Sequence, residues 1–240
     1  EAGLISVQAK ARHPLSPMQL GMLIHSLLEP GSGVYLQQVV CDLQEEIDWD
    51  HFRQAWQSVV GRHAALRTGF RWEEPDPPRQ EVHQPGTMEW QLHDCSGVSD
   101  GEWNRRLEVF LEADRRRGFE LGRGPWLRWT LFKRGESEHR WIWTSHHALL
   151  DGRSYAQLLR EGFEIYDALR DGHPRELRPG REFSEHVHWL AQQKFPGAES
   201  FWKERLAGFP VPTALPLERQ GAAGDRKSGR QQAVHARLTA

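Results

Sequence analysis

The feature that most restricts the fold of this chain is a pair of adjacent strand-like segments. A long helical pattern follows them directly. Residues 126–133 and 140–145 are rich in tryptophan, leucine and threonine, and the polar stretch 134–138 joins them. A short polar connection between two such runs is typical of an antiparallel hairpin. From about Ser154 onward, apolar residues recur at helical spacing. A helix that follows strands so closely predicts a sheet covered by helices.

Helix and strand signals alternate along the rest of the chain. Ser16, Pro17 and Gln19 supply the N-cap, the first-turn proline and the capping-box glutamine of a helix. Ser99 and Glu102 predict a second capping box. The other expected helices cover residues 183–193, residues 198–206 and the apolar stripe of Phe52, Trp56, Val59 and Val60. The other expected strands cover residues 34–43, 66–72, 80–82 and 88–92. The fold class is therefore α/β, an α+β sandwich in which helices cover a mixed sheet.

The domain organisation follows from a change in composition near residue 209. Up to that point the helix and strand patterns are continuous, and we expect one compact unit over residues 1–209. Residues 210–240 are rich in proline, glycine and charge, as in an exposed connector, and only 233–238 look strand-like again.

Charge and cysteine content exclude several classes of function. The 33 acidic and 31 basic residues give a net charge of -2, which predicts no nucleic acid and no anionic membrane as partner. Cys41 and Cys95 lie in neither a disulfide framework nor a metal-ligand spacing. The sequence shows no secretory leader and no apolar run of the roughly 20 residues that a spanning helix needs, so we expect a cytoplasmic protein. The eleven tryptophans fall mostly within amphipathic segments and are expected in the core.

The chemically most informative stretch is SHHALLDGRS at residues 145–154, where a strand ends and a helix begins. Neighbouring residues of a strand point to opposite faces, so His146 and His147 should face different environments. Imidazole suits proton transfer near neutral pH, and Asp151 is close enough to orient the loop that holds it. A structural histidine pair with satisfied hydrogen bonds is the alternative interpretation of these residues.

Four further segments combine with this stretch into an ordered set. The stretch contains the pattern HHxxxDG. Three segments precede it: SPMQLGML at 16–23, RHAALRTGF at 62–70 and FELGRGPWLR at 119–128. A weaker match follows it at 183–189. This set resembles the condensation domains of nonribosomal peptide synthetases, in particular their N-terminal lobe. Several ordered matches are far more specific than one short motif.

The resemblance implies a fold like chloramphenicol acetyltransferase, with two similar lobes and a tunnel between them. Donor and acceptor peptidyl carrier proteins would bring substrates on phosphopantetheine arms, with no cofactor bound directly, and the acceptor amine would attack the donor thioester. On this resemblance His147 is catalytic, and Gly152 leaves its backbone near the reacting centre. His146 is structural, and Asp151 pairs with Arg62 in a buried or half-buried ion pair.

The sequence departs from the family pattern in two places. Arg153 follows the motif glycine, where the family usually has an apolar residue. The family's later motifs, which build the second lobe, have no counterpart in residues 1–240. We therefore expect a single lobe whose partner is a missing C-terminal lobe, and we expect the isolated chain to be inactive.

Three alternatives stay open on the sequence. A non-catalytic lobe that binds carrier proteins would share these motifs. His146 and Asp151 also satisfy the HxxxxD pattern of glycerolipid acyltransferases, which would leave the other motifs unexplained. A metal site could draw on His146, His147, Asp151, His186 and His188, although a spacing of two on a helix sends the last two to different faces.

Overall fold

The computed structural model describes residues 9–73, 77–85, 90–120, 124–173, 180–209 and 211. The chain divides into two compact units, residues 1–192 and 193–240, and α6 (Ala198–Arg205) belongs to the second. The boundary that we expected near residue 209 stays a prediction, and the expected strand at 233–238 lies outside the described residues.

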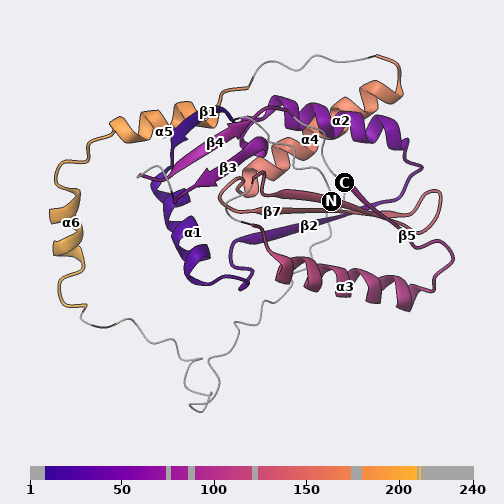
Figure 1. Ribbon diagram of the computed structural model, residues 1–240, viewed down its shortest axis with the longest axis horizontal. Helices are drawn as coiled ribbons and strands as arrows, with labels where there is room; N and C mark the ends of the chain where they lie inside the picture. Colours follow the sequence, from indigo (N-terminus) through magenta and orange to yellow (C-terminus); the bar gives the residue numbers. More distant parts are fainter. Residues whose placement is uncertain are drawn as a thin grey trace, which may run out of the picture. The chain divides into compact units, whose positions relative to one another are not determined.

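A four-stranded mixed sheet forms the centre of the first unit (Figure 1). Its strands run in the order β2 (Leu36–Leu43), β7 (His139–His146), β6 (Leu127–Lys133) and β5 (Trp90–Asp94). β5 and β6 are parallel, and the other neighbours are antiparallel. The pairing of β6 with β7 confirms the hairpin expected from the sequence.

Side-chain alternation along β7 assigns one helical layer to each face of this sheet. Trp141 and Trp143 point to α2 (Trp49–Arg62) and α4 (Gly152–Arg170), where they pack with the fully buried Trp56. Ile142 points to the opposite face and packs under α3 (Asp100–Arg117). Figure 1 shows α2 and α4 on one side of the sheet and α3 on the other. The helix-covered mixed sheet is confirmed. Six of the tryptophans are buried, but Trp189 and Trp202 are exposed, so the expected core position is wrong for these two.

A smaller sheet has the order β1 (Ala9–Pro14), β4 (Arg79–His83) and β3 (Thr68–Arg71). Between β1 and the first helix, α1 (Pro17–Leu28), the predicted capping box forms in full: Ser16 Oγ accepts from Gln19 N–H and Gln19 Oε1 accepts from Ser16 N–H. α5 (Phe183–Gln192) contacts β1.

Two local expectations are wrong. Leu66 and Arg67 lie in a 3-10 turn, η1 (Ala64–Arg67), instead of a strand, because the Arg67 guanidinium turns inward to the carbonyls of Val60 and Gly61. Ser99 caps α3, but the Glu102 carboxylate pairs with Arg105 and Arg106 on its own helix, so the second capping box is not reciprocal.

Candidate active site

The candidate site is the loop between β7 and α4, which borders a cleft of about 770 Å³ in the first unit. Gln19 of the capping box donates its side-chain N–H to Ala148 O at 3.1 Å, so α1 holds the loop directly. The remaining cleft wall comes from α2, α4, α5 and the segment before α5. Its titratable side chains are Arg62, His63, His147, Asp151, Arg181, Glu182 and His186.

His146 is buried at the end of β7 and is fully hydrogen-bonded. Its Nδ1 accepts from Ala148 N–H at 3.1 Å. Ser26 Oγ lies 3.0 Å from Nε2 and donates its own proton to Met22 O, so the imidazole must be neutral with the proton on Nε2. Burial, followed by the charge of His147, lowers the pKa of His146 to about 4. These contacts fit a structural histidine.

His147 is half-buried and borders the cleft. Its Nδ1 lies 2.7 Å from Leu150 O, and because a carbonyl oxygen only accepts, Nδ1 carries the proton. In the neutral imidazole the lone pair is therefore on Nε2. The expectation that His147 faces the cleft while His146 packs inside is confirmed.

Asp151 and Arg62 do not form the expected ion pair, although both are among the described residues. Asp151 is exposed and is the N-cap of α4, where its Oδ1 accepts from Ser154 N–H at 2.8 Å and from Ser154 Oγ at 2.6 Å. Those hydrogen bonds, the side-chain one first, lower the pKa of Asp151. Arg62 instead pairs with Glu161 of α4, Nε to Oε2, at 3.0 Å. Glu161 is the carboxylate that lies where α2 and α4 pack together, and it takes the place expected for Asp151.

Glu161 collects three donors at this helix contact. His63 Nε2 lies 2.6 Å from Oε2, and Gln157 donates to Oε1 at 2.9 Å. Burial alone would raise the pKa of Glu161, but the hydrogen bonds from Gln157 and His63 and the charges of His63 and Arg62 outweigh it and lower the pKa. The sequence analysis missed Glu161, because its contact with Arg62 depends on how α2 and α4 are turned about their axes where they pack.

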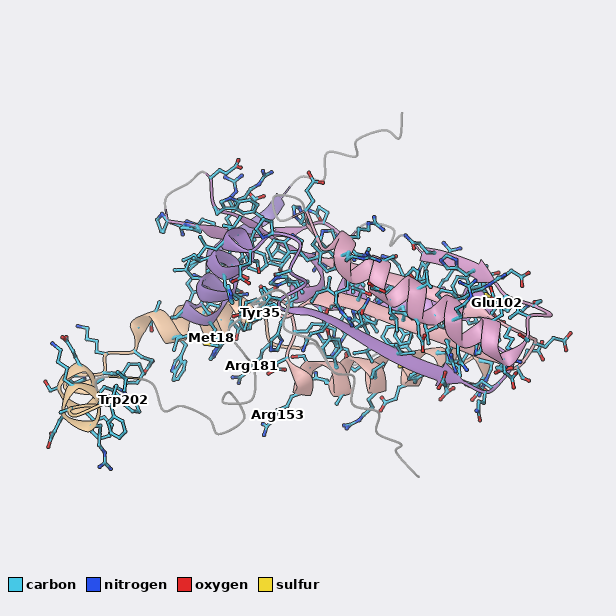
Figure 2. The ribbon with its side chains drawn as sticks, turned by 90° about the horizontal axis from the view of Figure 1, so that it is seen from below. Met18, Tyr35, Glu102, Arg153, Arg181 and Trp202 are labelled. Atoms are coloured by element: carbon cyan, nitrogen blue, oxygen red, sulfur yellow. The ribbon has the colours of Figure 1, made fainter. Side chains whose placement is uncertain are left out.

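Gly152 and Arg153 occupy the first turn of α4. A side chain at Gly152 would meet no atom within 4 Å, so packing does not demand glycine there. Arg153 is exposed, and Figure 2 shows its side chain pointing away from the sheet.

The metal-site alternative depends on how His146, His147, Asp151, His186 and His188 are arranged. The described residues hold no group of three or more His, Cys, Asp or Glu side chains arranged to bind a metal. His186 borders the cleft, whereas the His188 ring packs edge-on against His13 with centroids 5.6 Å apart. Within the described ranges, none of the helices is long and apolar enough to cross a bilayer.

Comparison with known proteins identifies the family. The model of the condensation domain matches residues 9–238. A linear gramicidin synthase from Brevibacillus parabrevis is 40% identical over 205 residues, which make up 85% of this chain and 3% of that protein. Surfactin synthase subunit 3 of Bacillus subtilis is 29% identical over 213 residues, which make up 89% of this chain and 17% of that protein. The chain thus spans a small part of these curated relatives.

Solved structures agree on the fold. The starter condensation domain of rhizomide synthetase matches with a TM-score of 0.71 at 21% identity, over 85% of this chain and 50% of that chain. The first condensation domain of the calcium-dependent antibiotic synthetase, in complex with a substrate analogue, matches with a TM-score of 0.73 at 20% identity, over 86% of this chain and 51% of that chain. The chain therefore spans about half the length of these solved chains.

Proposed function

The protein belongs to the condensation-domain family, acyltransferases that form peptide bonds in nonribosomal peptide synthetases, and we propose that it supplies the half of such a domain that carries the reacting histidine. In this proposal the donor is an acyl or peptidyl thioester and the acceptor is an aminoacyl amine. Each is delivered on the phosphopantetheine arm of a donor or acceptor peptidyl carrier protein.

The observation that carries this proposal is the fixed tautomer of His147 at the edge of the cleft. With Nδ1–H directed to Leu150 O, Nε2 is available to accept a proton. The acceptor nitrogen would attack the thioester carbonyl carbon, a C–N bond would form, and the C–S bond would break. The amine proton would pass to Nε2 and then to the departing thiolate. A free α-amino group has a pKa of about 7.7–8.0, so orienting the amine contributes beside proton transfer.

The other residues of the motif take supporting roles in this proposal. His146 holds the end of β7 through Ser26 and Ala148. Asp151 starts α4, and Gly152 follows it in the first turn of that helix, where its backbone would lie near the reacting centre. Arg62 ties α2 to α4 through Glu161 and supports the cleft wall.

We further propose that a second lobe completes the cleft. Support comes from the matched condensation-domain chains, which are about twice as long as the region that this chain covers. Two tethered substrates must be held in register for this reaction, and a cleft bounded on one side restricts them less than a closed tunnel does.

The test is His147→Ala in the synthetase that carries this chain, with loaded donor and acceptor carrier domains and mass spectrometric detection of the dipeptidyl thioester. We expect turnover to fall by about 10² to 10⁴, the usual contribution of one positioned acid–base group. His188→Ala, which changes an imidazole of α5 that packs against His13, is the matched control and should retain turnover. Unchanged turnover in His147→Ala, with carrier binding intact, would favour the non-catalytic carrier-binding lobe.

A further inference from the structure

Tyr35 stands out because its backbone is left-handed. It directly precedes β2 and has a φ of 63°, and among the described residues it is the one non-glycine position with positive φ. A left-handed backbone is unfavourable for a residue with a side chain, so neighbouring contacts must hold it, and such residues concentrate at functional sites.

The Tyr35 ring is held from two sides. Its hydroxyl lies 3.2 Å from His25 Nδ1, and the two rings meet edge-on with centroids 5.5 Å apart. The His146 ring lies on another side, with a centroid distance of 6.1 Å. Figure 2 shows Tyr35 at the start of the β2 ribbon. The ring is therefore fixed between α1 and the end of β7.

The Tyr35 carbonyl contacts His147, the residue that follows β7. The regular pairing of β2 with β7 begins at Leu36 opposite His146. One step beyond it, Tyr35 O accepts from His147 N–H at 2.7 Å. His147 is thus held at two points, its backbone by Tyr35 and its imidazole by Leu150 O.

We propose that Tyr35 is a positioning residue for His147: its anchored ring keeps the left-handed backbone that presents the carbonyl to the His147 amide. The inference rests on the proposed catalytic role of His147. Without the ring, a residue with a Cβ relaxes to negative φ and its carbonyl turns away from His147. Glycine adopts positive φ at no steric cost and still allows the contact.

Comparing Tyr35→Ala with Tyr35→Gly separates this role from simple packing. If the ring only fills space, alanine is the milder change because it leaves the smaller void. If the ring serves to hold the backbone, glycine is the milder change. Tyr35→Phe keeps the ring against His146 and should rescue most of the activity.

Two measurements are needed on these variants. In the synthetase, kcat and KM report on catalysis, and we expect kcat to fall by up to about 100-fold in Tyr35→Ala with little change in KM, as for a reacting group misplaced by about 1 Å. In the 240-residue chain, amide hydrogen exchange of His147 reports on the contact independently of activity. We expect faster exchange in Tyr35→Ala than in Tyr35→Gly.

Gly97→Ala is the matched control, because it places a Cβ at a φ of 75° in open space, in the turn between β5 and α3. It imposes comparable backbone strain without touching His147 and should change neither readout. His147 exchange in Tyr35→Ala that is unchanged, or no faster than in Tyr35→Gly, would overturn the inference whatever the kcat. Faster exchange with unchanged kcat would instead overturn the proposed function of His147.

Discussion

Acidification should destabilise this fold through His146. In the folded protein, burial and then the charge of His147 lower the pKa of His146 from 6.5 to about 4. The unfolded chain keeps the ordinary value, so between pH 6.5 and pH 4 the unfolded state binds more protons and the free energy of unfolding falls as the pH falls. The stabilisation by neutral His146 is fully present above pH 6.5, the pKa of His146 in the unfolded chain. The gap between the two pKa values corresponds to about 3 kcal/mol, a large part of the roughly 5–15 kcal/mol of a typical domain.

The local cause is a conflict between donors. Nδ1 of His146 accepts from Ala148 N–H at 3.1 Å, and a proton placed on Nδ1 would face that N–H. Ser26 Oγ lies against Nε2 and so offers no acceptor to Nδ1. Protonation therefore disrupts the turn instead of only adding a charge.

Denaturant unfolding of the 240-residue chain at pH 7 and near pH 4, followed by tryptophan fluorescence, measures this loss. His146→Gln is the reference, because it keeps a hydrogen-bonding amide and cannot titrate. Burial also lowers the pKa values of His93 and His139, and their contributions are common to both proteins. The natural chain should lose about 3 kcal/mol more than the variant between these pH values. Equal losses in the two proteins would refute the neutral, buried imidazole.

Two further predictions concern the motif loop and the second lobe. Asp151→Ala should cost about 1 kcal/mol of stability, as for the loss of a helix cap. A loss of about 3–5 kcal/mol in chemical denaturation would instead indicate a buried ion pair. The isolated chain, supplied with loaded carrier domains, should form no dipeptidyl thioester above the uncatalysed background in a mass spectrometric assay, and adding the second lobe should restore it. Turnover by the chain alone would contradict that proposal.

Local sequence signals predicted those features that depend on local geometry. The capping box of α1 needs only Ser16 and Gln19, and the opposite orientation of His146 and His147 needs only strand alternation. The N-cap role of Asp151 was readable in the same way, since an aspartate three residues before Ser154 at a helix start is a cap signal. The pairing of Asp151 with Arg62 was implied only by the family resemblance, and no local signal showed that Arg62 pairs with Glu161 instead.

Contacts that join distant segments could not be read from the sequence. Glu161 reaches Arg62 and His63 only because α2 and α4 pack at one rotational phase. The left-handed backbone of Tyr35 depends on rings from α1 and β7 that lie close only in the folded chain. Such a conformation is the opposite of tyrosine's local preference, so a prediction from propensity assigns it wrongly.

The two adjacent histidines act as one structural unit. Because His146 ends β7, its imidazole is directed inward, and its Nδ1 binds the amide of Ala148 in the following turn. That same turn brings Leu150 O to Nδ1 of His147 and so sets which nitrogen of the cleft-facing ring is free. The neutral state of the buried ring and the tautomer of the cleft-facing one therefore depend on a single backbone conformation over residues 147–150. A change at His146 reaches the cleft through the backbone and does not require the two rings to touch.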